Sequence, residues 1–294
     1  MFVQLIHNPA SGTHDDDRLS ILSRAFEACG ASVVAGQTSI NGMVRFATHV
    51  DLVCVSGGDG ALRQVVAEMA RQNIRQPVCV FPAGTVNLIA RELGYSSQAE
   101  QFAQEVMTGF LNGARLKDPL AMTDHGPLVA CLSAGPEGLA VARHRPSLKK
   151  RIGGLAYAVS ALGLLASWPR STFHLHIDQQ RLICEAFYVV KGHFFAGDWT
   201  LVPQARLGMN HFHLLSLNRL TRWNYLRFLL KVAMNKDPES LDFVQLQSIS
   251  SFRIESPTGA AQLAFQVDGD SMPDAPEEVR ISEFSVEYCL PQAG

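Results

Sequence analysis

The sequence lacks the features that would draw the chain to nucleic acid or into an oxidising compartment. Its 294 residues hold 25 Lys and Arg against 27 Asp and Glu, and this balance excludes a strong basic field. The six cysteines include no C-x-x-C pair and lie mostly among apolar neighbours, so we expect reduced, buried thiols. The first residues have neither the basic start nor the cleavage site of a signal peptide, and we expect a cytoplasmic protein.

Long hydrophobic runs are also missing. The uncharged segment 152–168 is interrupted by glycine and serine, and it is shorter than the about 20 apolar residues that span a bilayer. We expect residues 150–168 to form a buried helix or a helix that lines a cleft. A composition of 47% hydrophobic and 18% charged residues is typical of a globular protein, and this length favours about two domains.

Residues 1–118 alternate short apolar runs with helical periodicity, which predicts an α/β domain. Strands that alternate with helices form a parallel sheet with helices on both faces, and ligands bind beyond the carboxyl ends of such strands. The expected strands are residues 2–6, 32–35, 51–55 and 77–81, and the expected helices are residues 16–29, 42–49, 61–73 and 86–93.

Residues 119–294 have a different pattern, which predicts a β-rich, sandwich-like domain of antiparallel strands. Helices are expected only near residues 150–168 and 221–235, and residues 178–181 are typical of a hairpin turn. The expected strands are residues 126–133, 172–178, 182–190, 212–217, 243–254, 261–267 and 279–290.

Three glycines and an aspartate follow the expected strand 51–55, and a helical pattern begins directly after them. In a strand, glycine loop and helix of this kind, backbone N–H groups point at a phosphate. The loop has neither the lysine of a G-x-x-x-x-G-K loop nor the spacing G-x-G-x-x-G. Because a carboxylate repels a phosphate unless Mg²⁺ or a basic group intervenes, the aspartate favours a metal-bound nucleotide. The loop residues are Gly57, Gly58, Asp59 and Gly60.

Two further polar loops are expected at the same edge of the sheet. Thr85 and Asn87 open the helix that follows the fourth strand, where they offer a hydroxyl and an amide; Thr85 could instead only cap that helix. Asn8, Ser11 and Gly12 lie in the loop after the first strand. The chain therefore has three candidate ligand loops at one sheet edge.

Taken together in order, these motifs resemble the catalytic domain of the diacylglycerol kinase and sphingosine kinase family. The resemblance continues through a basic cluster and Gly-x-x-Ala-Tyr segment within residues 143–162, and through a Gly-x-x-x-Gly and Pro-x-Ala stretch within residues 192–205. It ends at Asp268-Gly269-Asp270, so that it spans nearly the whole chain. The implied fold has an NAD-kinase-like first domain to which the last strand of the chain returns.

The resemblance implies that the chain uses ATP and Mg²⁺ to phosphorylate the hydroxyl of a diacylglycerol-like lipid, as in phospholipid biosynthesis. It implies catalytic roles for Asp268 and Asp270, one of which takes the proton of the acceptor hydroxyl. It also implies a metal ligand at Asp59. A plain hairpin turn is the alternative for Asp268-Gly269. The implied nucleotide-binding residues are Asn8, Ser11, Gly12, Thr38, Gly57, Gly58, Asp59, Gly60, Thr85 and Asn87.

The chain departs from the family pattern at four places. Ala61 stands where the family usually has Thr, Leu88 stands where many members have Asp, and Asp270 replaces Glu. The family also has a structural Mg²⁺ site at an Asp-Gly after Pro-x-Ala. Residues 208–210 of this chain, Gly-Met-Asn, offer no carboxylate there, so we do not expect that second metal site.

Residues 219–236 combine basic and aromatic residues without an acidic one, a composition that suits the surface of an anionic membrane. We therefore expect a lipid substrate, transient membrane contact and no nucleic-acid partner. Nothing in the sequence indicates an oligomeric state. An amphipathic helix that packs on a sheet is the alternative for this segment.

Two other functions stay open. An NAD kinase shares the glycine-aspartate loop, although Asn8-Pro9-x-Ser11-Gly12 and the segment 219–236 argue against it. A non-catalytic pseudokinase that binds nucleotide and lipid is the second alternative, and the changes at Ala61 and Leu88 favour it.

Overall fold

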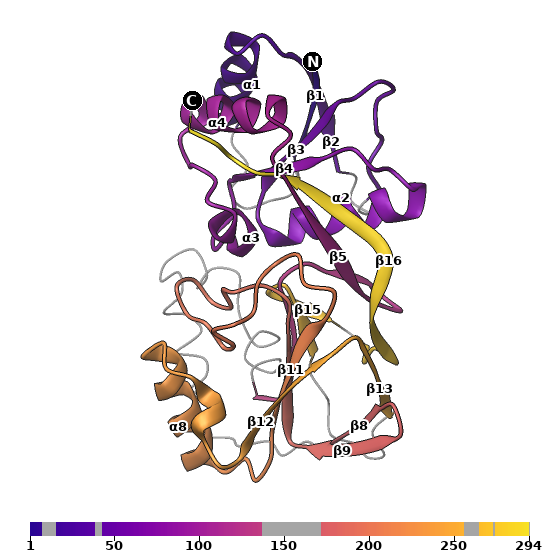
Figure 1. The fold of residues 1–294 in the computed structure, drawn as a ribbon, viewed down its shortest axis with the longest axis vertical. Helices are drawn as coiled ribbons and strands as arrows, with labels where there is room; N and C mark the ends of the chain where they lie inside the picture. The colour runs from indigo at the N-terminus through magenta and orange to yellow at the C-terminus, as the bar shows by residue number, and fades with distance from the viewer. Residues whose placement is uncertain (8–15, 39–42, 137–171, 256–264, 273, 294) are drawn as a thin grey trace. The chain divides into compact units, whose positions relative to one another are not determined.

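The computed structural model describes residues 1–7, 16–38, 43–136, 172–255, 265–272 and 274–293 (Figure 1). These residues form two compact units. Unit 1 comprises Met1–Leu120 and Glu283–Gly294, and unit 2 comprises Ala121–Ser282. The predicted helix 150–168 and the loop of Asn8, Ser11 and Gly12 lie outside the described residues.

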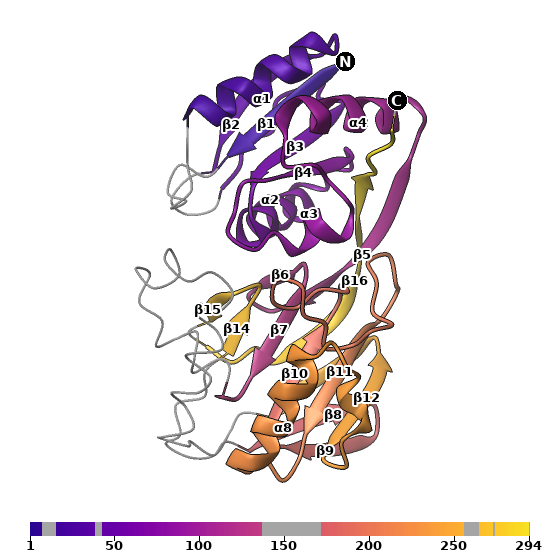
Figure 2. The same cartoon turned by 90° about the vertical axis from the view of Figure 1, so that its left-hand side faces the viewer.

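Unit 1 is built on a parallel sheet in the order β2-β1-β3-β4, which confirms the predicted fold class. Its central strand β3 is buried along its whole length, as expected for a strand with helices on both faces. Helices α1 and α4 lie on one face of this sheet and α2 lies on the other (Figure 2). The strands are β1 Phe2–His7, β2 Ser32–Gln37, β3 Leu52–Gly57 and β4 Val78–Pro82, and the helices are α1 Asp16–Ala28, α2 Asp59–Gln72, α3 Leu88–Glu92 and α4 Ala99–Leu111.

Helix α4 is an element that the sequence analysis missed. Its Phe102 is fully buried and packs against the rings of Phe26, Phe81 and Tyr95 at centroid distances of 6.0, 5.2 and 5.4 Å. Aromatic pairs at such distances prefer tilted and edge-on geometries, which these rings adopt. The sequence does contain a signal for this helix, because apolar residues recur with helical spacing at Phe102, Ala103, Val106 and Met107, which are all buried.

The predicted helix at residues 42–49 is wrong over residues 43–49, where the structure has an irregular segment. Val44 makes an isolated antiparallel bridge with Thr38. The buried side chain of Gln4 donates to the Arg45 carbonyl at 2.7 Å and accepts from the Ala47 amide at 3.0 Å. This one side chain satisfies backbone groups that a helix would otherwise pair internally.

The last strand, β16 Glu278–Cys289, contributes its carboxyl-terminal half to unit 1. Tyr288 pairs in parallel with Val78 of β4, and the Tyr95 hydroxyl donates to the Cys289 carbonyl at 2.6 Å. The Leu290 amide donates to the Ala114 carbonyl, directly before β5 Arg115–Thr123. The sheet of unit 1 therefore includes residues from the far end of the chain.

Unit 2 contains a six-stranded antiparallel sheet in the order β12-β11-β10-β7-β14-β15. A second layer pairs the first half of β16 with β13, then β8 and β9. Among the described residues, α8 Arg222–Ala233 is the α-helix of this unit, and Thr221 caps it by accepting the Asn224 amide at 3.1 Å. The strands are β6 Gly126–Leu128, β7 Cys131–Ala134, β8 Phe173–Ile177, β9 Gln180–Cys184, β10 Ala186–Val190, β11 Phe212–Leu217, β12 Val244–Ile249, β13 Ser251–Glu255, β14 Phe265–Val267 and β15 Asp270–Met272.

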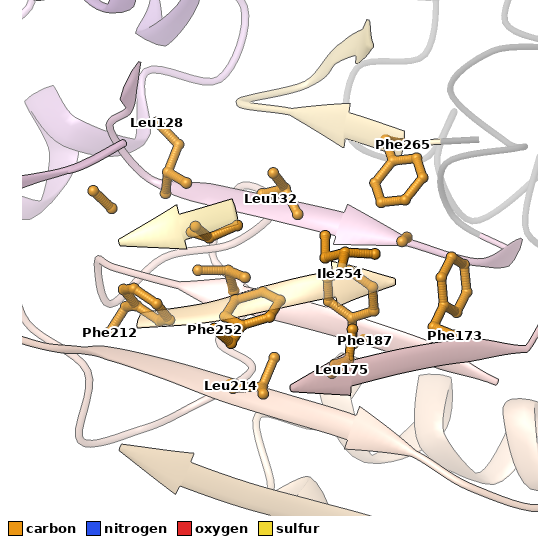
Figure 3. Packing of buried hydrophobic residues seen from close by; sticks show 14 of the residues in the cluster. Leu128, Leu132, Phe173, Leu175, Phe187, Phe212, Leu214, Phe252, Ile254 and Phe265 are labelled. Atoms are coloured by element: carbon orange, nitrogen blue, oxygen red, sulfur yellow. The ribbon is translucent and has the colours of Figure 1, made fainter. Parts of the chain in front are cut away.

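A cluster of phenylalanines fills the space between the two layers of unit 2 (Figure 3). The Phe187 ring of the six-stranded sheet makes edge-on contacts with Phe173 and Phe252 of the second layer at 5.2 and 5.8 Å. Alternate residues of each strand reach this core, as in a β-sandwich. The predicted β-rich second part of the chain is confirmed.

Two predicted strands of this unit are each divided in the structure. The expected strand 182–190 is interrupted at Glu185, and the expected strand 243–254 is interrupted at Ser250. In both cases the chain passes from one layer to the other, so a continuous apolar run contains two short strands. The predicted hairpin at residues 178–181 is confirmed, because β8 and β9 pair through Ile177 and Gln180.

The six cysteines form no disulfide among the described residues, and five of them are buried. Burial raises the pKa of the Cys289 thiol to about 11 and raises the pKa of Cys79 well above its ordinary value. A thiol with a raised pKa stays protonated and behaves as a small apolar side chain. The cysteines therefore belong to the core.

Candidate active site

The glycine loop of unit 1 lies at the carboxyl end of β3. Gly58 is the N-cap of α2 in an extended conformation, and its helix has no side-chain cap. The first N–H groups of a helix have no partner within the helix, and they favour an anion. The sequence predicts a phosphate-binding loop at this position, and the backbone arrangement is the one that such a loop requires.

The second loop packs directly on the glycine loop. A Cβ atom added to Gly84 would lie 2.5 Å from the Gly58 Cα atom and 2.9 Å from the Gly58 nitrogen. Real side chains do not approach backbone atoms this closely, so the contact requires glycine at position 84. A side chain at position 58 would also be crowded, because its Cβ atom would lie 3.2 Å from the Gly84 Cα atom. The contact brings the ends of β3 and β4 together as one surface of exposed backbone.

Asp59 ties these two loops together. Its carboxylate accepts the Leu88 amide at 2.9 Å and the Ile89 amide at 3.0 Å, at the first turn of α3. The residue is only 8% exposed. The two amides stabilise the buried charge, because a carboxylate is favoured at the N-terminus of a helix. The predicted metal contact of Asp59 stays a prediction.

Asn87 fixes the second loop from within. Its φ angle is +56°, and its side chain accepts the Gly84 amide at 2.8 Å and donates to the Gly84 carbonyl at 2.9 Å. Asn87 is also the N-cap of α3, without a side-chain cap bond. Thr85 therefore does not cap that helix, and its side chain is exposed on the loop.

Thr38 lies at the neighbouring carboxyl end of β2. Its amide donates to the His7 carbonyl at 3.0 Å, and the residue is only 4% exposed. The Thr38 hydroxyl has no hydrogen-bond partner among the described residues. A buried hydroxyl without a partner is costly, so its position is consistent with a polar ligand at this edge. This hydroxyl and the Gly58–Gly84 contact are both consistent with a nucleotide at this edge, which stays a prediction.

The late acidic motif of unit 2 forms a two-residue hairpin between β14 and β15. Val267 pairs with Asp270, and the two turn residues Asp268 and Gly269 have φ angles of +49° and +83°. Turns with two positive φ angles match the twist of a hairpin. The hairpin alternative for Asp268-Gly269 is therefore confirmed as the local structure.

The two carboxylates of this hairpin have different surroundings. Asp268 accepts three backbone amides, from Val129 at 3.0 Å, Ala130 at 2.8 Å and Cys131 at 3.0 Å. Asp270 begins β15 and is exposed. Three N–H donors fix the Asp268 carboxylate and stabilise its charge, whereas Asp270 lies on the surface of unit 2.

Gln266 supports the same hairpin from its buried side. Its side-chain oxygen accepts the Gly269 amide at 2.8 Å, and its side-chain nitrogen donates to the Ser133 hydroxyl at 3.0 Å. The residue is almost fully buried. The sequence analysis assigns no role to Gln266, because a glutamine inside an apolar strand gives no catalytic signal.

Two of the positions that depart from the family pattern, Ala61 and Leu88, carry apolar residues. A Cβ atom on Gly57 would lie 2.6 Å from the Ala61 Cβ atom, so Ala61 stands against the glycine loop. Leu88 is buried while its amide donates to Asp59. Among the residues that the structure describes, no group of three or more His, Cys, Asp and Glu side chains is arranged to hold a metal ion.

Comparison with known proteins supports the resemblance to a family. Residues 3–117 match the sequence model of the diacylglycerol kinase catalytic domain, the part of the chain that forms the loops described above. The chain resembles the diacylglycerol kinase family. The resemblance that the motifs predict is confirmed by this match and by the similar proteins below.

Two bacterial relatives extend the resemblance beyond the first unit. A diacylglycerol kinase of Staphylococcus haemolyticus (strain JCSC1435) is 25% identical over 303 residues, which cover 98% of this chain and 88% of that protein. A diacylglycerol kinase of Bacillus subtilis (strain 168) is 25% identical over 234 residues, or 76% of each chain. These relatives support a lipid kinase role.

The fold is also similar to a solved one. A diacylglycerol kinase structure from Bacillus anthracis str. Sterne has a TM-score of 0.72 with this chain at 19% identity, and the match covers 98% of this chain and 96% of that one. At this identity the likeness concerns the fold, an α/β unit followed by a β-rich unit. No helix among the described residues is both long enough and apolar enough to cross a membrane.

We predict that Asp59→Asn weakens the binding of MgATP about tenfold or more, because an amide cannot accept both helix amides and the second loop loses its anchor. Calorimetric titration of the folded variant measures this change. Asp51→Asn is the matched control: Asp51 accepts the Phe2 amide at the opposite end of β3, at 2.7 Å. Equal affinities of the two variants would contradict the anchoring role of Asp59.

Proposed function

We propose that this protein transfers the γ-phosphoryl group of ATP to the hydroxyl of a diacylglycerol-like lipid. The observation that carries the proposal is the contact of the two glycine loops, joined by Asp59, inside the segment that matches the diacylglycerol kinase catalytic domain. The two relatives with the same printed name support the choice of lipid as acceptor.

The nucleotide is held by unit 1 in this proposal. Backbone N–H groups at Gly58 and Gly60 face the phosphates, and the hydroxyls of Thr38 and Thr85 donate to them. Gly57 and Asn87 keep the loops in shape, and the loop with Asn8, Ser11 and Gly12 completes the site. MgATP supplies the phosphoryl group and a cation that neutralises its charge.

The acceptor hydroxyl is activated by unit 2 in this proposal. Asp270 takes the proton of the lipid hydroxyl, since its carboxylate is exposed at the hairpin. Asp268 is a positioning residue, because its three amide bonds hold the turn that carries Asp270. This division assigns one role to each of the two predicted catalytic carboxylates.

A second candidate is a pseudokinase that binds nucleotide without turnover. Ala61 and Leu88 favour it, because both replace residues that would offer a hydroxyl or a carboxylate near the phosphates. The glycine loops and Asp59 serve nucleotide binding equally well in this case. The two candidates differ only in whether phosphate reaches a lipid.

We predict that incubation with γ-labelled ATP, Mg²⁺ and diacylglycerol yields labelled phosphatidic acid, and that chelation of Mg²⁺ abolishes the label. A total lipid extract in a parallel reaction shows whether another hydroxylated lipid is preferred. Labelling of NAD in place of lipid would overturn the proposal in favour of an NAD kinase. Binding of ATP with no labelled lipid in either reaction would favour the pseudokinase.

We predict that Asp270→Asn lowers the rate of phosphate transfer by about 10²–10⁴-fold, as expected for loss of a general base. Its melting temperature stays at that of the parent chain, because the side chain is exposed. Asp268→Asn lowers the melting temperature as well, since an amide cannot accept three N–H groups. Full activity of Asp270→Asn, or an unchanged melting temperature of Asp268→Asn, would contradict these roles.

We further propose that α8 brings the protein to an anionic membrane. Trp223 and Leu230 are 67% and 51% exposed, and Met234, the C-cap residue of α8, is 54% exposed. Arg222 and Lys236 are exposed beside them. Apolar side chains flanked by cations are typical of helices that lie in a lipid interface. The opposite side of α8, with Tyr225, packs in the core, so the helix also serves the alternative structural role.

We predict that the double variant Trp223→Ala, Leu230→Ala weakens sedimentation with phosphatidylglycerol vesicles roughly tenfold or more, because less apolar surface enters the interface. Leu111→Ala is the matched control, a leucine on α4 that is 76% exposed. If the control and the double variant sediment alike, α8 is not the membrane contact.

A further inference from the structure

Lys191 is a buried cation that none of the proposed roles uses. It follows β10 directly and is only 1% exposed, which is unusual for a lysine. Its ammonium donates to the Met209 carbonyl at 2.6 Å. Burying an ammonium is expensive unless it is paired or hydrogen-bonded, so this contact is a built feature of unit 2.

The carbonyl that Lys191 binds belongs to the turn where the family resemblance implies a structural Mg²⁺. A divalent cation of this kind takes oxygen ligands, with at least one or two carboxylates. Residues 208–210 supply none, and the Met209 carbonyl already accepts an ammonium hydrogen. The residues present therefore do not fit the metal.

The lowered pKa of a histidine on the neighbouring strand, β11, agrees with this interpretation. Burial lowers the pKa of His213, and the charges of His211 and Lys191 lower it further. The His211 and His213 rings are 5.1 Å apart. A place that already disfavours one more positive charge on an imidazole is a poor place for Mg²⁺.

Lys191 also lies at the end of the six-stranded sheet where the hairpin between β14 and β15 carries Asp268 and Asp270. Its amide donates to the Ala130 carbonyl at 2.9 Å, while the amide of Ala130 donates to Asp268. One peptide segment thus connects the Lys191 backbone to the hairpin of Asp268 and Asp270. The ammonium fixes the neighbouring turn, residues 207–210, which leads into β11 at the same edge.

We infer that the Lys191 ammonium takes the place of the structural divalent cation at the turn 207–210, so that unit 2 folds and keeps this sheet edge without bound metal. A lysine ammonium and a bound metal ion can each interact with the carbonyl oxygens of a turn. The lysine does so permanently, whatever the concentration of Mg²⁺. This replacement concerns only the structural cation; the Mg²⁺ that binds with ATP is a separate ion.

The test is the Mg²⁺ dependence of stability without ATP or lipid, so that a failed kinase assay would not affect it. We expect the parent chain to melt at the same temperature in EDTA and in MgCl₂. Met209→Asp restores a carboxylate, but beside Lys191 it gains no Mg²⁺ response. The double variant Lys191→Met, Met209→Asp gains a Mg²⁺-dependent rise of roughly 5–10 °C when the ion is about a hundredfold above its Kd.

Hydrogen exchange gives the second readout. Lys191→Met is expected to accelerate exchange of the amides in residues 207–212, whereas the exposed control Lys236→Met leaves it unchanged. Lys191→Arg keeps the charge and is expected to keep the protection, which covers the case in which Lys191→Met does not fold. A Mg²⁺-dependent melting temperature of the parent chain, equal Mg²⁺ responses of Met209→Asp and the double variant, or loss of protection in Lys191→Arg would overturn the inference.

Discussion

The carboxylate of Asp59 is the interaction on which the candidate nucleotide site depends. It joins the end of β3 to the start of α3 across a contact that requires glycine at position 84. A buried anion beside a phosphate site is unfavourable by itself. Here two helix amides offset its charge, and the aspartate can order the loops without leaving an unpaired acceptor.

Asp268 has the corresponding structural role in unit 2. Asp268 accepts amides from the segment before β7 and from the first residue of β7, and Asp59 accepts amides from the first turn of α3. In both places an aspartate next to a glycine holds backbone that is distant in the sequence. A motif that is read as catalytic from its residue types can therefore be structural in part.

The sequence was sufficient for β1 to β4 and for α1, α2 and α3 of unit 1, because period and glycine placement are local signals, although α4 was missed. It was not sufficient where tertiary contacts decide. Gln4 draws residues 43–49 out of the expected helix by binding their backbone groups. Glu185 and Ser250 mark transitions between layers that an apolar run cannot reveal. The burial of Lys191 and the three amides on Asp268 likewise depend on strands far apart in the chain.

The return of β16 to unit 1 has a consequence for biosynthesis. A ribosome delivers residues 121–282 before Tyr288 and Cys289, whose contacts with β4 and Tyr95 close the sheet of unit 1. The sheet of unit 1 therefore lacks a strand until β16 is made, whereas unit 2 can already collapse on its own phenylalanine core. Until β16 has been made, the β4 edge that it will cover is exposed and could pair with a foreign strand.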